Sequence, residues 1–247
     1  MTPAESALLP LWCRAKCALE YPALGVGGAD AGIIRGLRAD FSLARRSDAL
    51  LYALRELLLA AAAEEYLAGH PRAAIVSLGC GLDTLPRRLG SAHGARIYVD
   101  LPEVIALRRR LLPEAEGETY IAADLARGGF REPVPAGDGA FFLMGGLLCH
   151  LDAGAVTGLL GGLGADYPGA GLAFDGLSPI ARRLAGMASA LPGEAELSRR
   201  CSLTLRRVKR LPDAFAAVPA GRRLRLAALL HTGALRFYAG RCGHNMA

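Results

Sequence analysis

Short, continuously apolar segments alternate with amphipathic ones through the middle of the chain. Each of the five apolar segments is predicted to form a β-strand. They occupy residues 73–78, 95–100, 119–125, 139–146 and 170–176. Helical patterns fill the intervals, at residues 49–69, 84–90, 102–112 and 152–167. Because the predicted strands are apolar on both faces, they are expected to pair mostly in parallel, with helices covering both sides of the sheet.

The two ends of the chain carry weaker patterns. The first 46 residues look helical and irregular, with a glycine-rich break at "LGVGGADAG", and Ser47-Asp48 is a candidate N-cap for the helix that follows. Near the other end, "CSLTLRRV" and "ALRFYAG" are expected to close the sheet as antiparallel strands. Without an internal repeat or a low-complexity linker, residues 1–247 are expected to form one domain. Its parts are an N-terminal helical cap (1–70), an α/β core (71–180) and closing elements (181–247).

Composition is that of a globular protein, with 52% hydrophobic and 21% charged residues. No apolar run reaches the roughly 18–20 residues that a membrane span needs. The N-terminal sequence also lacks the basic region and long apolar core of a secretory signal. Six cysteines in a chain of 247 residues do not form a small disulfide scaffold, so they are interpreted as reduced thiols in a cytoplasmic protein.

The net charge of +6 comes largely from the last fifty residues. Such a basic region can bind nucleic acids or acidic substrates. No aromatic residues interleave with these arginines as stacking platforms, so a solvated basic surface is favoured over a nucleic-acid site. The cysteine pair at 13/17 and the cysteine–histidine pairs at 149/150 and 242/244 do not combine into a recognised zinc spacing, and no metal site is expected.

The stretch "IVSLGCGLDT" places a glycine-rich loop directly after the first predicted strand. A nucleoside triphosphate loop would need a lysine and a Ser/Thr after the glycines, and neither is present. The dinucleotide fingerprint would need a third glycine where Thr84 stands. Asp83 lies where the phosphates would sit and would repel them. The loop formed by Gly79 and Gly81 therefore favours a cofactor without phosphate.

Acidic residues follow the next strands of the predicted sheet. Asp100 ends the second strand and Asp124 ends the third, and both are expected at the carboxyl edge where α/β proteins bind ligands. S-adenosylmethionine suits this edge, because it has a sulfonium, an ammonium and a ribose diol but no phosphate. Asp100 is then expected to bind the ribose hydroxyls and Asp124 the adenine amino group.

Several segments together resemble one family. "VSLGCGLDTLPRRL", "YVDLPEVIALRRRLLP", "IAADL" and "GGLLCHL" are similar to the leucine carboxyl methyltransferase superfamily, and most similar to its bacterial branch of polyketide O-methyltransferases. The N-terminal "LLPLWCRAKCALEYP" fits the same branch. The resemblance covers about residues 7–180. It implies a Rossmann-like class I methyltransferase sheet and S-adenosyl-L-methionine as the cofactor.

The resemblance also implies further site residues. Lys16 and Arg55 match the lysine and arginine that hold the carboxylate of the cofactor in relatives. Leu101 and Leu125, which follow the two strand-end aspartates, are assigned to the same site. Asp175, in "FDGLSP", matches the end of the fifth strand and is expected to line the substrate pocket.

This chain departs from the family after the fourth strand. Gly145 stands where relatives have a glutamate that contacts the cofactor, His150 replaces a tyrosine, and Leu85 replaces a frequent arginine. His150 is a candidate general base for a phenolic acceptor, whereas methyl transfer to a carboxylate needs no base. The lost glutamate is expected to weaken cofactor binding by about 1.5–3 kcal/mol.

The sequence thus predicts an S-adenosylmethionine-dependent O-methyltransferase. Its acceptor is expected to be a hydroxyl or a carboxylate of a small molecule. The alternative is a member of the same family that has lost catalysis and serves as a cofactor-binding or scaffold protein. Methylation of nucleic acid is a third, less favoured hypothesis, and the oligomeric state stays open.

Overall fold

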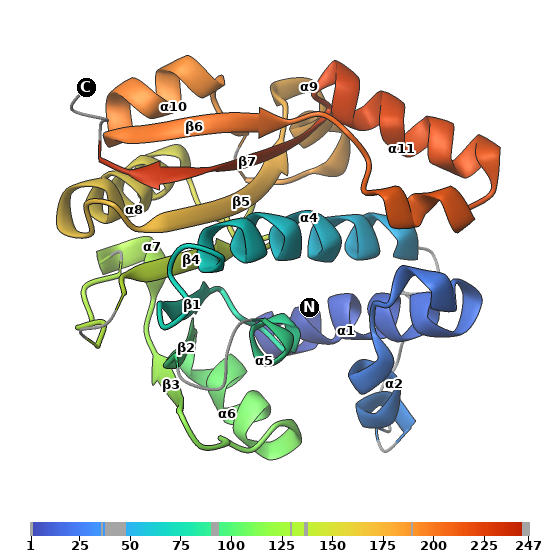
Figure 1. Ribbon diagram of the computed structural model, residues 1–247, viewed down its shortest axis with the longest axis horizontal. Coiled ribbons are helices and arrows are strands. Elements are labelled where there is room, and N and C mark those ends of the chain that lie inside the picture. Colours follow the sequence, from blue (N-terminus) through green and yellow to red (C-terminus); the bar gives the residue numbers. More distant parts are fainter. Residues whose placement is uncertain are drawn as a thin grey trace.

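A mostly parallel sheet of seven strands, in the order β3-β2-β1-β4-β5-β7-β6, forms the centre of the protein (Figure 1). The computed structural model describes residues 2–35, 37, 48–89, 94–128, 130–135, 138–188 and 190–243. The strands are β1 (Ala74–Leu78), β2 (Arg96–Asp100), β3 (Glu118–Ala122), β4 (Ala140–Met144), β5 (Gly171–Leu177), β6 (Leu203–Val208) and β7 (Leu235–Cys242). Only β7 runs antiparallel to both of its neighbours, so the expected mixed sheet is confirmed.

The helices of the described residues lie before, between and after these strands. They are α1 (Pro3–Glu20), α2 (Gly28–Arg35), α4 (Ala49–Leu67), α5 (Leu85–Arg88), α6 (Pro102–Leu111), α7 (Leu125–Gly128), α8 (Ala153–Asp166), α9 (Pro179–Ala185), α10 (Glu194–Cys201) and α11 (Ala220–Thr232). Two short 3₁₀ helices are η1 (Pro22–Leu24) and η2 (Asp213–Ala217). Asp48 caps α4 by accepting a hydrogen bond from the Leu50 N–H, whereas Ser47 lies outside the described residues.

Side chains on the two faces of the sheet form separate apolar clusters. On one face α1, α4 and α11 pack against β4, β5 and β7, and on the other α7, α8 and α10 pack against β1, β4 and β5. The strands β1 and β4 are buried along their whole length, which explains why their sequences are apolar throughout rather than alternating. Helices on both faces are therefore present, as the pattern predicted.

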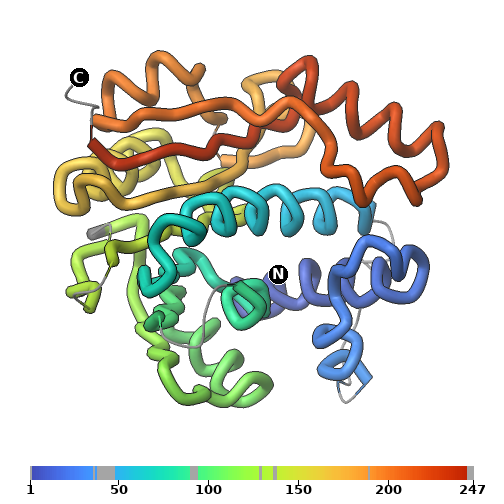
Figure 2. The backbone as a smooth tube through the Cα atoms, in the orientation of Figure 1, coloured from blue at the N-terminus to red at the C-terminus, as the bar shows by residue number. Residues whose placement is uncertain are grey.

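Strand order determines where a ligand site can lie. The chain runs outward from β1 to β3 and then returns to β4 on the other side of β1, so strand order reverses between β1 and β4. Open α/β sheets bind ligands beyond the carboxyl ends of the strands at this reversal. Figure 2 shows that the N-terminal helices and α11 both extend past one end of α4, where η1 contacts η2 and Arg222 donates to the Tyr21 hydroxyl.

Two boundaries differ from the sequence prediction. The strand β3 ends at Ala122, so Asp124 lies at the start of α7 and not at a strand end. The strand β5 extends to Leu177, so Asp175 lies inside the strand and its side chain is 2% exposed. Both aspartates still belong to the carboxyl half of the sheet.

Candidate functional site

The glycine loop after β1 turns sharply at the carboxyl edge. Gly79 and Gly81 have φ angles of 64° and 48°, a left-handed conformation that glycine adopts without a steric penalty. The Gly79 and Cys80 N–H groups donate to the Val99 carbonyl at 2.8 and 3.1 Å, which fixes the loop to β2. Asp83 accepts a hydrogen bond from the Leu85 N–H at 2.9 Å across Thr84, the N-cap residue of the short helix α5. The expected loop is present, and the Asp83 side chain stabilises the turn that leads into α5.

Asp100 joins the end of β2 to this loop. One carboxylate oxygen accepts from the Gly81 N–H at 2.7 Å and the other from the Leu101 N–H at 2.8 Å. Burial raises the pKa of Asp100, while these two N–H groups and the charge of Arg108 act to lower it. Leu101 is the N-cap residue of α6 and packs at the edge of an apolar cluster. Two of the predicted site residues, Gly81 and Asp100, are therefore in direct contact.

Asp124 and Leu125 lie farther along the same edge. The Asp124 side chain is 41% exposed, accepts from the Ala126 N–H at 3.0 Å and pairs with Arg127 at 3.3 Å. It thus acts as a local cap of α7 and keeps part of its surface open to a ligand. The Leu125 side chain is buried in the core on the face that α7 and α8 cover, so only its backbone can face the edge.

A buried bridge of three residues lies at the ends of β4 and β5. The Arg55 Nε donates to Asp175 at 2.9 Å, and the Gly146 N–H donates to the other carboxylate oxygen of Asp175 at 2.6 Å. A Cβ atom at Gly145 would lie 3.3 Å from the Arg55 Cδ, so this arginine lies over the two glycines. Arg55 and Asp175 are 120 positions apart in sequence, and nothing in the sequence indicated that they pair.

His150 and Cys149 follow in the turn after β4. The His150 ring is exposed on its outer side, yet desolvation by the protein behind it and the charge of Arg55 lower its pKa. The Cys149 thiol donates to the Gly146 carbonyl, and burial raises its pKa to about 11. His150 is therefore neutral at physiological pH and able to accept a proton, and Cys149 is an unreactive thiol.

Helix α1 presents Arg14 to the glycine loop. Arg14 is buried, donates to the Leu82 carbonyl at 3.1 Å and pairs with Asp30 at 2.7 Å and Glu56 at 3.3 Å. Lys16 points along a different face of the helix, pairs with Glu20 at 3.5 Å and is about one third exposed. The predicted role of Lys16 stays a prediction, whereas Arg14 contacts the loop and was missed by the sequence reasoning.

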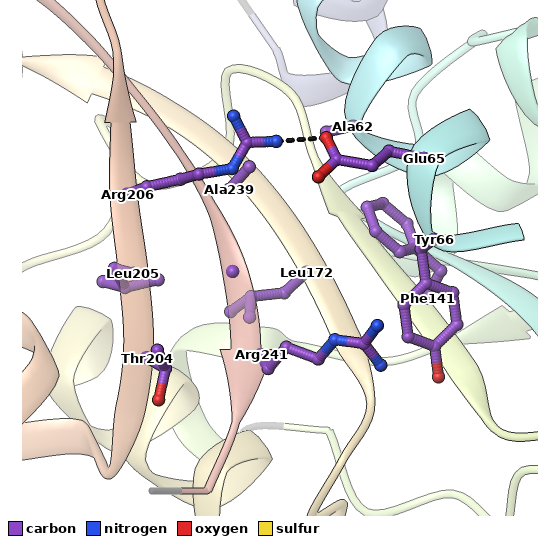
Figure 3. A pocket seen from close by; sticks show the side chains of 11 residues that line it. Ala62, Glu65, Tyr66, Phe141, Leu172, Thr204, Leu205, Arg206, Ala239 and Arg241 are labelled. Atoms are coloured by element: carbon purple, nitrogen blue, oxygen red, sulfur yellow. Dashed lines mark hydrogen bonds and ion pairs between the residues drawn. The ribbon is translucent and has the colours of Figure 1, made fainter. Parts of the chain in front are cut away.

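The cavity drawn in Figure 3 lies away from this edge. It has a volume of about 230 Å³ and is lined by Tyr66, Phe141, Leu172 and Arg241, among others. Phe141 and Leu172 are the second residues of β4 and β5, so the cavity lies toward the amino ends of the parallel strands. The Arg241 guanidinium lies 4.6 Å from the centre of the Tyr66 ring.

Two further observations concern the described residues as a whole. Among them, no helix is long and apolar enough to cross a membrane. Within the same part of the chain, no three His, Cys, Asp or Glu side chains gather closely enough to hold a metal ion. His244, which belonged to one of the cysteine–histidine pairs, lies outside the described residues.

The strand order and the carboxyl-edge loop define a class I methyltransferase fold. Solved structures of similar fold include the N-methyltransferase NodS from Bradyrhizobium japonicum WM9 in complex with S-adenosyl-L-homocysteine, with a TM-score of 0.57 and 14% identity over 87% of this chain and 98% of that chain. Human N-acetylserotonin methyltransferase in complex with SAM gives a TM-score of 0.50 and 15% identity, over 87% of this chain and 65% of that one.

Sequence comparison narrows the class to a family. Residues 49–164 match the model of the leucine carboxyl methyltransferase family. The tetracenomycin polyketide synthesis O-methyltransferase TcmP of Streptomyces glaucescens is 31% identical over 167 residues, which cover 66% of this chain and 62% of that protein. Over residues 49–164 the chain is therefore similar to the leucine carboxyl methyltransferase family, in line with the resemblance noted in its sequence. It spans less than two thirds of the length of this curated relative.

Proposed function

We propose that the protein is an S-adenosylmethionine-dependent O-methyltransferase that methylates a hydroxyl or a carboxylate of a small molecule. The observation that carries this proposal is the contact between the Gly81 N–H and the Asp100 carboxylate at 2.7 Å. It places a carboxylate beside a glycine loop at the carboxyl edge, which suits a ribose diol and repels a phosphate. The matched family region extends from α4 through β1 and β2 to α8 and so contains this contact.

The residues around the loop fit the two ends of the cofactor. Each oxygen of the Asp100 carboxylate accepts one backbone hydrogen bond and can accept another. The ribose hydroxyls would donate these further hydrogen bonds. At the other end Arg55 uses only its Nε for Asp175 among the described residues, so its two terminal nitrogens would bind the carboxylate of the amino-acid moiety. Asp124 would bind the adenine amino group, and Lys16 would add a second cation at the carboxylate.

The bound cofactor would supply an electrophilic methyl group on a sulfonium. For a phenolic acceptor, His150 would take the hydroxyl proton, and its lowered pKa keeps the ring neutral and ready to accept it. A carboxylate acceptor is already ionised at neutral pH and would need only to be positioned. Six buried, unpaired cysteines agree with a reducing, cytoplasmic setting for the enzyme.

Gly145 was the main reason to consider a family member without activity. Asp175 reaches Gly146 and Arg55 from the neighbouring strand, so a carboxylate is present beside the position where relatives have glutamate. This nearby carboxylate favours an active enzyme over a family member that has lost catalysis. The similarity to a polyketide O-methyltransferase makes aromatic polyketides that carry phenol or carboxylate groups the first acceptors to assay.

Isothermal titration with S-adenosylhomocysteine tests the cofactor assignment. We expect saturable one-to-one binding, and tenfold weaker binding or more for Asp100→Asn. The exposed Asp166→Asn variant serves as the control, because Asp166 lies at the distant end of α8. No detectable heat with millimolar S-adenosylhomocysteine would exclude the proposal. Transfer of labelled methyl groups to a panel of phenols and carboxylic acids would then identify the acceptor group.

A further inference from the structure

Arg108 is a buried cation that no carboxylate neutralises directly. Its side chain is fully buried in α6, with the guanidinium carbon 3.9 Å from the centre of the Tyr98 ring and 4.9 Å from that of Tyr120. No described carboxylate lies within ion-pair distance of it, and its Nε and Nη2 atoms have no hydrogen-bond partner among the described residues. Arg110, two positions further along the helix, is exposed and so shows the ordinary behaviour of a helix arginine.

Burying the Arg108 guanidinium lowers the stability of the fold, so stability does not explain its presence. An unpaired buried donor costs about 1–3 kcal/mol, and contact with two aromatic rings returns only part of that. A methionine would fill a similar volume between Tyr98 and Tyr120 without two unmatched nitrogens. A role beyond packing would explain why arginine stands at this position.

Within the described part of the chain, Arg108 donates a hydrogen bond to the backbone of the glycine loop. Its Nη1 donates to the Gly81 carbonyl at 3.1 Å. The same glycine donates its N–H to Asp100 at 2.7 Å. Gly81 is thus held on both sides of its Cα, by Arg108 through the carbonyl and by Asp100 through the amide. Because glycine lacks a Cβ atom, its backbone is little restrained by its own side chain, and these two bonds, with a longer contact from the Cys80 thiol to the Gly81 carbonyl at 3.7 Å, hold its orientation.

We propose that Arg108 is a positioning residue that fixes the Gly81–Asp100 contact and thereby orients the Asp100 carboxylate toward the ribose hydroxyls of the cofactor. The inference rests on the proposed function, because it needs a nucleoside at the carboxyl edge. Arg108 touches neither cofactor nor acceptor in this role. It acts through Gly81, and its positive charge adds a favourable field at the buried carboxylate.

The test compares two ligands that differ only in the ribose hydroxyls. Titrations use S-adenosylhomocysteine and its 2′,3′-dideoxy analogue, with the wild-type protein, Arg108→Met and the control Arg110→Met. In the wild type and the control, we expect the hydroxyls to improve the dissociation constant tenfold or more. In Arg108→Met we expect this ratio to fall to threefold or less, with the dideoxy analogue bound about as well as by the wild type.

A purely structural role predicts a different outcome. If Arg108→Met weakens both ligands by the same factor, or weakens neither, the inference is wrong. It is also wrong if the wild type does not distinguish the two ligands. Failure of the wild type to bind S-adenosylhomocysteine at all would instead contradict the proposed function. The two failures are therefore distinguishable in one series of titrations.

A second variant keeps the inference testable if Arg108→Met does not fold. Arg108→Lys retains the charge but has a single nitrogen, so we expect an intermediate ratio for the two ligands. Combining it with Asp100→Asn completes a double-mutant cycle. If the two residues act on the hydroxyls together, Arg108→Lys has no further effect on the ratio once Asp100 is replaced. Independent, additive effects would overturn the inference.

Discussion

Replacing Asp175 by asparagine is expected to destabilise the fold and to weaken binding of the amino-acid end of the cofactor. The carboxylate accepts from the Arg55 Nε at 2.9 Å and from the Gly146 N–H at 2.6 Å. Asparagine has nearly the same shape and keeps one oxygen for the Gly146 N–H. It then turns an amide NH₂ group toward Arg55, so two donors face each other.

The magnitude follows from the burial of the two partners. Asp175 is 2% exposed and Arg55 is 26% exposed. Removing one partner of a buried ion pair costs about 3–5 kcal/mol, but a partly exposed arginine regains water, so we expect about 2–3 kcal/mol. At about 2–4 °C per kcal/mol for a domain of this size, the melting temperature should fall by about 4–12 °C.

Thermal denaturation followed by circular dichroism measures the loss of stability. Ligand titration measures how far the displacement of Arg55 weakens ligand binding. S-adenosylhomocysteine carries the amino-acid carboxylate, and 5′-methylthioadenosine does not. We expect Asp175→Asn to bind the first about tenfold more weakly and the second unchanged, since a misplaced Arg55 affects only the carboxylate. The exposed Asp166→Asn should match the wild type. An unchanged melting temperature, or equal losses for both ligands, would refute the reasoning.

Three other predictions concern the glycine loop, the Arg14 side chain that contacts it, and the loss of stability at low pH. Gly79→Ala should lose more stability in urea than Gly81→Ala, because a Cβ at Gly79 would lie 3.0 Å from the Leu147 Cβ and one at Gly81 meets only the Ala7 Cβ, at 3.7 Å. The reverse order would contradict the loop geometry. Arg14→Met leaves the buried Asp30 carboxylate without its cation and Glu56 with Arg88 alone, and should cost about 3–5 kcal/mol in the same assay, against less than about 1 kcal/mol for the exposed Arg109→Met. Although burial acts to raise it, hydrogen bonds led by that from Arg87 lower the pKa of Glu118 to about 2. The stability advantage of the wild type over Glu118→Gln should therefore be full above pH 4.5 and shrink as the pH falls toward 2; a constant difference between pH 7 and pH 3 would speak against this.

Local patterns in the sequence were sufficient to predict the strands of the sheet and the glycine loop. Continuous apolar runs predicted β1 and β4 because both faces of these strands are buried. The Gly-x-Gly spacing predicted a glycine-rich loop directly after the first strand, and the structure has this loop, with Gly79 and Gly81 in the left-handed conformation. Both features depend on residues that are close together in sequence, which is why they could be read before the fold was known.

The supporting charges could not be predicted in this way. Arg14 and Lys16 are two positions apart on one helix and face different directions, and only the packing of α1 against α4 decides which one reaches the loop. Arg108 stands in a run of three arginines that resembles a solvated surface, yet it is fully buried. Asp175 was expected at a strand end and pairs with a residue 120 positions earlier. Each of these contacts depends on tertiary packing that no short segment encodes.

Four charges that link the N-terminal helices to α4 and α5 have a consequence for the exchange of segments between similar proteins. Asp30 of α2, Arg14 of α1, Glu56 of α4 and Arg88 of α5 form one chain of alternating sign, and Arg14 also holds the Leu82 carbonyl. An N-terminal segment exchanged from a similar protein would have to bring an arginine for Glu56 together with an aspartate for that arginine, or it would leave the buried Glu56 with Arg88 as its one described cation. Helices α1 and α2 should therefore be exchangeable between similar proteins only as one unit with the residues of α4 and α5 that they pair with.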